Sequence, residues 1–149
     1  MSGKKSYREL SLSTRPILVP GAYDALSARI AELVGFEVVI VSGYATTASL
    51  MAKPDFGLLT QTEVITTARY IAQSVGIPVI ADADTGYGGP INVIRTVREL
   101  EAAGVQGMII EDQLWPKRCG HMTVSYTHLR AHETVLDLVC RLLLDKKKQ

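Results

Sequence analysis

Three continuous runs of apolar residues, each ending in small or acidic residues, constrain the fold of this chain most strongly. They are VVIVSG (38–43), IPVIADAD (77–84) and VQGMIIED (105–112), and a weaker run, PILVPG (16–21), precedes them. Their apolar residues do not alternate with polar ones. These runs therefore predict strands that are buried on both faces, as in a parallel sheet.

Helical patterns separate these runs, over residues 22–35, 60–76 and 92–104. Each pattern ends in glycine, a common residue at the carboxyl end of a helix. Thr60 and Glu63 have the spacing of a capping box, and Asn92 is the expected N-cap of the last helix. The alternating order of strands and helices predicts a parallel α/β fold.

The choice within this fold class is between an open sheet and a barrel. No glycine-rich dinucleotide fingerprint follows the first strand, which argues against a Rossmann domain. A (β/α)8 barrel needs about 250 residues, and this chain has 149. We therefore expect residues 1–122 to form the N-terminal half of a (β/α)8 TIM-type barrel, truncated after its fourth strand.

Composition excludes several classes of protein. A net charge of +1 gives no general attraction to nucleic acid or to a membrane surface, and no run approaches the ~18 apolar residues of a membrane span. The amino terminus lacks the apolar segment of a secretory signal. Two cysteines do not make a disulfide framework. We expect a cytoplasmic protein without nucleic-acid or membrane partners.

Acidic residues stand at the ends of the predicted strands, where barrels hold their active sites. Asp82 and Asp84 follow the third strand, and strand alternation places them on one face. Glu111 follows the fourth strand. Three convergent carboxylates favour Mg2+, often held through water. The alternative for any single acid is a helix cap or an ion pair with a lysine.

Two further segments contain candidate functional residues. The amides of SGYATTASL, a loop by its composition, are suited to cradling an anion such as a carboxylate. Asp55 in PDFG is either a turn former or an acid that supports or gates the site. In PKRCGH, Lys117, Arg118 and His121 surround Cys119 with positive charge. Such charge lowers a thiol pKa and suits the thiol to proton transfer.

Together these residues resemble the isocitrate lyase/phosphoenolpyruvate mutase superfamily, especially its 2-methylisocitrate lyase-like members. The matching stretches are VPGAYDALSA, VSGY, PDFGLLT, ADADTGYG, IIEDQ and PKRCGH, between Ser6 and His121. The resemblance implies a Mg2+-dependent carbon–carbon lyase that cleaves a 2-hydroxy tricarboxylate, of the 2-methylisocitrate or isocitrate type, into an α-keto acid and succinate. It also implies a homo-oligomeric parent protein.

The resemblance also implies a role for each candidate residue. Ser42, Gly43 and Tyr44 would bind the substrate's carboxylate and keto oxygen, Asp55 would be a gating acid, and Asp82, Asp84 and Glu111 would form the Mg2+ site. Cys119 would be the catalytic acid that protonates the released carbanion. Lys117, Arg118 and His121 would set the pKa of that thiol and hold the departing carboxylate.

Some residues depart from the lyase pattern and leave the substrate open. Tyr44 and Ala45 stand where methylisocitrate lyases tend to have glycine, and Ile109 replaces a frequent histidine. A phosphonomutase, a carboxyphosphonoenolpyruvate mutase-like enzyme or an oxaloacetate decarboxylase of the same superfamily is the alternative. Without the second half of the barrel, we expect this chain itself to be inactive.

The segment after Met122 admits three interpretations. It contains a possible helix over residues 134–144, and Cys119, His121, His128 and His132 suggest a zinc-binding module. The third interpretation is a translated sequencing adapter over residues 123–149, because VSYTHLRAHE and LVCRLLL can each be written in codons of a transposase-based adapter. The adapter would also supply two bases of the Thr134 codon and two of the Asp137 codon, which leaves a gap of eight bases, the length of an index barcode. We favour this interpretation, in which residues 123–149 are not a domain.

Overall fold

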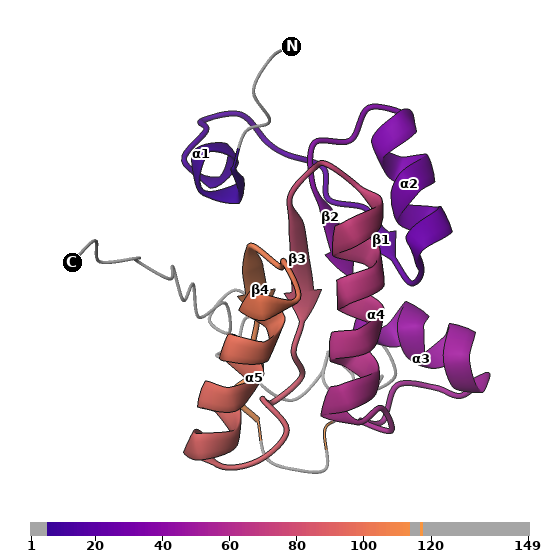
Figure 1. Cartoon of the computed structure of the whole chain (residues 1–149), viewed down its shortest axis with the longest axis vertical. Coiled ribbons are helices and arrows are strands. Elements are labelled where there is room, and N and C mark those ends of the chain that lie inside the picture. The colour runs from indigo at the N-terminus through magenta and orange to yellow at the C-terminus, as the bar shows by residue number, and fades with distance from the viewer. Residues whose placement is uncertain (1–5, 114–116, 118–149) are drawn as a thin grey trace, which may run out of the picture.

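The computed structural model describes residues 6–113 and residue 117. Its centre is a four-stranded parallel sheet whose strands neighbour one another in chain order (Figure 1). The strands are β1 (Gly21–Ala22), β2 (Val39–Val41), β3 (Val79–Asp82) and β4 (Gly107–Ile109). The last three lie within the strong apolar runs, whereas β1 starts at the final residue of the weak run. The predicted parallel α/β fold is confirmed.

The helices of the described part are α1 (Tyr7–Ser11), α2 (Ala25–Leu33), α3 (Gly43–Met51), α4 (Gln61–Ser74) and α5 (Pro90–Ala102). Figure 1 shows α4 and α5 running alongside the sheet, with α1 near the amino ends of the strands. Among the described residues, no helix combines the length and apolar character needed to cross a membrane.

Both faces of the sheet are covered, which explains the continuous apolar runs. One face packs against α2, α4 and α5, and its core includes Val39, Val41, Val79, Ala81, Ala28, Ile71 and Leu100. On the other face, Val38 and Ile80 pack against Leu10 of α1. Because side chains alternate along a strand, Asp82 follows Ile80 on this second face, opposite the face that α2, α4 and α5 cover.

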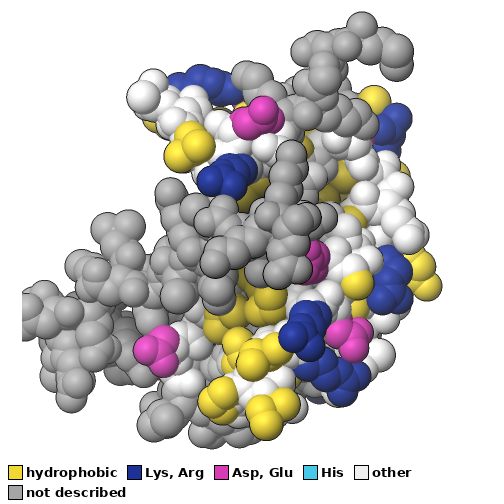
Figure 2. Space-filling model, turned by 60° about the vertical axis from the view of Figure 1, so that its left-hand side comes forward, with side chains coloured by type: hydrophobic (Ala, Val, Ile, Leu, Met, Phe, Trp, Pro, Cys, Tyr) yellow, Lys and Arg dark blue, Asp and Glu magenta, His cyan; other side chains and the backbone are white. Residues whose placement is uncertain are grey.

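Several large hydrophobic side chains are nevertheless exposed. Leu26, Ile30 and Leu33 on α2 and Ile91 and Ile94 on α5 are all at least half exposed. Figure 2 shows hydrophobic side chains gathered on the surface of the described part. Apolar helix faces of this kind are what a partial barrel presents, because neighbouring units that would cover them are not among these residues.

The helix starts are partly as predicted. The Thr60 hydroxyl accepts a hydrogen bond from the Glu63 amide, and the Glu63 carboxylate accepts one from the Thr60 amide at 2.7 Å. The predicted capping box is therefore confirmed. The N-cap prediction for Asn92 is wrong, because α5 begins at Pro90 with Gly89 as its N-cap. Proline suits a first helical position, since its fixed φ is already helical.

The predicted glycine ends hold for two of the three helices. Gly35 and Gly104 have φ of 99° and 96° and follow α2 and α5 closely. By contrast, α4 ends at Ser74, and its C-cap Val75 is extended. The prediction that this helix runs to Gly76 is wrong.

The predicted loop after β2 is also wrong, because this segment forms α3. Ser42 is its N-cap, and the Ser42 hydroxyl accepts a hydrogen bond of 3.3 Å from the Ala45 amide. The segment has one glycine and two threonines, residues of low helix propensity. Only the serine cap could have indicated a helix.

Candidate functional site

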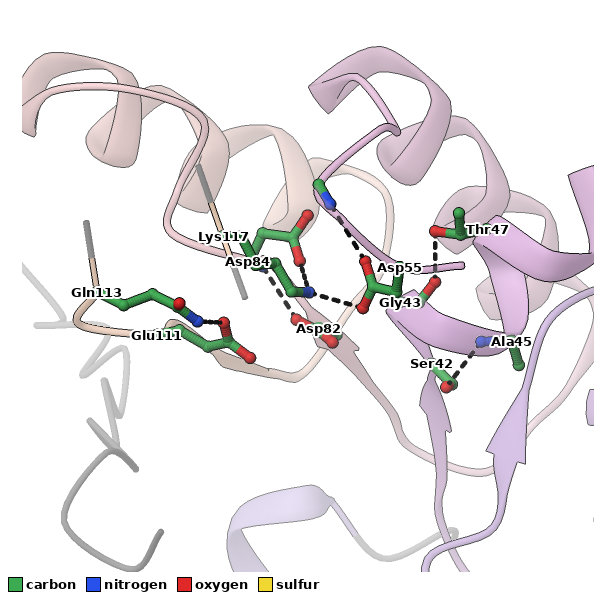
Figure 3. Close-up of polar contacts among 11 residues, drawn as sticks. Ser42, Gly43, Ala45, Thr47, Asp55, Asp82, Asp84, Glu111, Gln113 and Lys117 are labelled. Atoms are coloured by element: carbon green, nitrogen blue, oxygen red, sulfur yellow. Dashed lines mark hydrogen bonds and ion pairs between the residues drawn. The ribbon is translucent and has the colours of Figure 1, made fainter. Parts of the chain in front are cut away.

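The carboxyl ends of β3 and β4 bring acidic side chains together around a lysine (Figure 3). Asp82 is the last residue of β3, and Asp84 and Glu111 follow β3 and β4 by two positions. Asp55 comes from the loop between α3 and α4, and Lys117 follows β4. These five residues, which we call the charge cluster, lie at the edge where parallel α/β barrels hold their active sites.

The Lys117 ammonium joins two of the acids. Its Nζ lies 2.9 Å from Asp55 Oδ2 and forms both an ion pair and a hydrogen bond with Asp84 Oδ1. At most 6 % of each of these three side chains is exposed. Buried charges are tolerated when they are paired and hydrogen-bonded. The three residues therefore form one ionic network, which is buried and shielded from solvent.

Asp82 lies against the amino end of α3. A Cβ added at Gly43 would stand 2.7 Å from Asp82 Oδ2 and 3.7 Å from Lys117 Nζ. The other carboxylate oxygen, Asp82 Oδ1, accepts a hydrogen bond of 3.0 Å from the Asp84 amide. Any side chain at position 43 would have to displace this carboxylate. Glycine at this position therefore lets the Asp82 carboxylate approach the start of α3 closely.

Asp84 reaches the charge cluster through a turn. Its φ is 48°, a left-handed conformation that few residues other than glycine adopt. The Glu111 amide donates to the Asp84 carbonyl oxygen at 2.7 Å, and the Thr96 hydroxyl donates to the Gly86 carbonyl oxygen at 3.0 Å. Asp82 and Asp84 thus share one cluster as expected. The expected strand alternation is not the cause, because β3 ends at Asp82.

Tyr87, in the same turn, is a residue that sequence reasoning missed. Its φ is 63°, and its buried hydroxyl has no hydrogen-bond partner among the described residues. Burial, followed by the nearby Asp84 and Asp82 carboxylates, raises the pKa of Tyr87 far above its ordinary value. The phenol therefore stays protonated and can donate a hydrogen bond to a water or ligand. The tyrosine within DTGYGG was the only signal for it.

The electrostatics of the charge cluster favour an additional cation. Burial raises the pKa values of Asp82 and Asp84, and Lys117 opposes both shifts. Burial would lower the pKa of Lys117, but Asp82 and Asp84 outweigh it and the pKa is raised. With all groups ionised, four carboxylates and one ammonium carry four negative charges and one positive, leaving a net three negative.

The predicted Mg2+ ligands fit a hydrated ion. Asp82, Asp84 and Glu111 offer carboxylate oxygens, which Mg2+ prefers, usually together with several waters. Glu111 accepts a hydrogen bond from the Gln113 side chain. Within residues 6–113 and 117, no three acidic, histidine or cysteine side chains converge closely enough to hold a metal directly. The Mg2+ site stays a prediction, with binding largely through water.

The residues predicted to bind substrate fall into two places. Ser42, Gly43 and Tyr44 begin α3, and Tyr44 is half exposed. The first amides of a helix have no partners within it, so they attract anions. Asp55 is buried against Lys117, and its Oδ1 also accepts a weak bond of 3.5 Å from the Gly57 amide. Asp55 therefore has both a turn-forming contact and a contact within the charge cluster.

The other predicted catalytic residues, Arg118, Cys119 and His121, lie outside the described residues. The same holds for His128 and His132 of the zinc alternative and for the helix predicted over residues 134–144.

Residues 7–137 match the family described as phosphoenolpyruvate phosphomutase. The chain belongs to the phosphoenolpyruvate mutase/isocitrate lyase superfamily. The resemblance inferred from the sequence motifs is therefore confirmed. So is the fold, because the solved structures that it matches are barrels of this superfamily.

The relatives of this superfamily member catalyse different reactions. It is 48 % identical over 122 residues to 2,3-dimethylmalate lyase of Eubacterium barkeri, covering 82 % of this chain and 42 % of the relative. Identity is 57 % over 107 residues to the chloroplastic carboxyvinyl-carboxyphosphonate phosphorylmutase of Arabidopsis thaliana, covering 71 % and 32 %. The sequence identity is 50 % over 115 residues to 2-methylisocitrate lyase of Aeropyrum pernix, and the match covers 77 % of this chain and 37 % of the relative.

The solved structures that this chain resembles also belong to enzymes with different activities. Oxaloacetate acetylhydrolase in complex with the inhibitor 3,3-difluorooxalacetate superposes with a TM-score of 0.74 at 44 % identity, covering 83 % of this chain and 42 % of that one. Phosphonopyruvate hydrolase in complex with oxalate and Mg2+ superposes with a TM-score of 0.66 at 38 % identity, and the match covers 70 % of this chain and 36 % of that one. The chain spans 32 to 42 % of the length of the curated relatives described above.

Proposed function

We propose that the whole protein containing this chain is a Mg2+-dependent carbon–carbon lyase. Its substrate would be a 2-hydroxy tricarboxylate of the 2-methylisocitrate or isocitrate type, and its products an α-keto acid and succinate. The observation that carries the proposal is the charge cluster, in which Asp55, Asp82, Asp84 and Glu111 outnumber their single lysine. The 50 % identity to a 2-methylisocitrate lyase supports it.

Asp82, Asp84 and Glu111 would hold the ion, largely through water. Bound there, Mg2+ would supply electrostatic stabilisation of the negative charge that develops on the keto-acid oxygen during cleavage. The amides at the start of α3, from Gly43 onward, would bind a substrate carboxylate beside it. The buried ion pairs of Lys117 with Asp55 and Asp84 would hold the loops that carry these residues in fixed positions relative to one another.

The bond changes follow from this arrangement. Water or a carboxylate of the charge cluster would take the proton of the substrate's 2-hydroxyl, and this oxygen becomes the carbonyl of the keto acid as the adjacent carbon–carbon bond breaks. The bonding electrons leave on the second fragment as a carbanion stabilised by its carboxylate. We assign its protonation to Cys119, whose thiol proton completes the second product, succinate. Arg118 and His121 would favour the resulting thiolate.

A phosphonomutase is the second candidate, because identity reaches 57 % with the Arabidopsis phosphorylmutase. An oxaloacetate-cleaving enzyme is the third candidate, since oxaloacetate acetylhydrolase is a structural relative. All these reactions place negative charge on the oxygen of a 2-oxo acid, which the same cluster would stabilise. Tyr44, Ala45 and Ile109 are where this chain departs from the lyase pattern.

The test is an assay of the whole gene product with 2-methylisocitrate, isocitrate, 2,3-dimethylmalate and oxaloacetate, with and without Mg2+. Mg2+-dependent formation of pyruvate or glyoxylate together with succinate would support the lyase. Absence of turnover of the first two substrates would overturn this proposal, and turnover of oxaloacetate alone would favour the alternative.

A further inference from the structure

Lys117 occupies the part of the charge cluster that a metal ion would also need. Its Nζ contacts Asp84 Oδ1, and Asp84 is one of the three proposed Mg2+ ligands. The ammonium is 1 % exposed, so little solvent screens its charge from the cluster. Two positive charges that share one carboxylate repel each other strongly in such a buried place.

The contacts of Asp82 and Asp55 show what Lys117 would lose and what it would keep when a cation binds Asp84. Asp82, the second proposed ligand, lies so near Lys117 that the ammonium is the main charge opposing its raised pKa. Asp55 Oδ2, at 2.9 Å, gives the ammonium a partner outside the proposed Mg2+ ligands. Lys117 can therefore lose Asp84 to another cation and keep one ionic contact.

We propose that Lys117 and a divalent cation compete for Asp84, so that Lys117 sets how tightly the site binds the cation. This inference rests on the cation site of the proposed function. It assigns Lys117 a positioning role within the site, distinct from the role in tuning the Cys119 thiol that the sequence motif implies. The Lys117–Asp84 contact weakens binding of the cation. By thermodynamic linkage, the bound cation weakens the Lys117–Asp84 contact by the same factor.

The first test measures Mg2+ binding by isothermal titration calorimetry to the 149-residue chain and to its Lys117→Gln variant. Removal of the competing charge is expected to tighten Mg2+ binding by about 5- to 150-fold, the usual range of coupling between sites. Lys53→Gln is the matched control, because it removes the same charge from an exposed lysine near Asp55. It should leave the affinity within about twofold, and Lys117→Arg, which keeps the charge, should not tighten binding.

Unchanged or weaker binding by Lys117→Gln, with normal binding by the wild type, would overturn this inference and leave the proposed function standing. Failure of the wild type and the variant to bind Mg2+ at all would overturn this inference, and the assay of the whole gene product decides the proposed function separately.

The second test needs no variant and so does not depend on how well Lys117→Gln folds. Acylation of Lys117 by an amine-reactive reagent is followed by mass spectrometry in the wild-type chain, with and without saturating Mg2+. Because Mg2+ would take Asp84 from the ammonium, the acylation rate of Lys117 should rise severalfold while that of Lys53 stays constant. An unchanged Lys117 rate would overturn the competition.

Discussion

The Lys117 ammonium lies 2.9 Å from Asp55 Oδ2, and the two residues come from different βα units of the sheet. Asp84, from a third segment, contacts the same nitrogen. Three loops at the carboxyl edge of the sheet are therefore tied together by one buried charge. This links the folding of the edge to the geometry of the candidate site.

Replacing Asp55 with asparagine should destabilise the chain. Lys117 would keep Asp84 but lose one charged partner, and hydrogen bonds to charged groups contribute about 1.5–3 kcal/mol. We expect urea denaturation to show a loss of that size in the free energy of unfolding. Asp112→Asn, at an exposed acid near the same edge, should change it by less than about 0.5 kcal/mol. Equal stability of the two variants would contradict the buried network.

Replacing Gly43 with alanine should disturb Asp82. At an ordinary helical position this change stabilises a helix by about 1 kcal/mol, but here the new Cβ would stand 2.7 Å from Asp82 Oδ2. We expect a lower melting temperature and weaker Mg2+ binding. The control is Gly89→Ala, because a Cβ there meets nothing within 4 Å. A Gly43→Ala variant that is more stable than the wild type and binds Mg2+ normally would show that the close approach is not required.

The stability contributed by Glu63 should depend on pH. Its hydrogen bonds from the side chain and amide of Thr60 hold the pKa of the Glu63 carboxyl below its usual range. A carboxyl whose pKa is lowered by folding contributes stability above its unfolded pKa and loses it as pH falls through the folded value. The difference in unfolding free energy between wild type and Glu63→Gln, from urea titrations, should be full at pH 7 and vanish at strongly acidic pH. A difference independent of pH would argue against the ionised capping box.

The interpretation of residues 123–149 as translated adapter predicts their codons. Sequencing of the coding DNA should give GTC TCT TAT ACA CAT CTC CGA GCC CAC GAG for residues 124–133. Synonymous codons that differ from the adapter within this stretch would contradict the interpretation.

The strands β2, β3 and β4 could be predicted from the sequence because their apolar runs are continuous and end in small or acidic residues. The weak run over residues 16–21 misplaced β1, which is Gly21–Ala22. Helices with strong caps could be predicted as well, as Thr60 and Glu63 show. What failed was α3, whose glycine and threonine residues resemble a loop, and the start of α5, where Asn92 looked like a better N-cap than Gly89. In α3 tertiary packing outweighed local propensity, whereas the start of α5 follows the local preference of proline for the first helical position.

The sequence singled out the acids at the strand ends and Lys117, but not the contacts between Lys117 and those acids. Asp82, Asp84 and Glu111 were predicted as site residues because parallel strands end at one edge. The pairing of Lys117 with Asp55 could not be predicted, because contacts between distant loops leave no periodic signal. Nor could the turn of Asp84 and Tyr87, since residues other than glycine seldom adopt positive φ.

Mg2+ binding to wild type and to Asp82→Asn, measured by calorimetry, tests the central claim most directly. Asp82 ends β3, and its carboxylate interacts electrostatically with Lys117, Glu111 and Asp55 of the charge cluster. We predict one saturable site in the wild type and affinity lower by about tenfold or more in Asp82→Asn. A wild type that binds no Mg2+, or a variant that binds it equally well, would contradict the account.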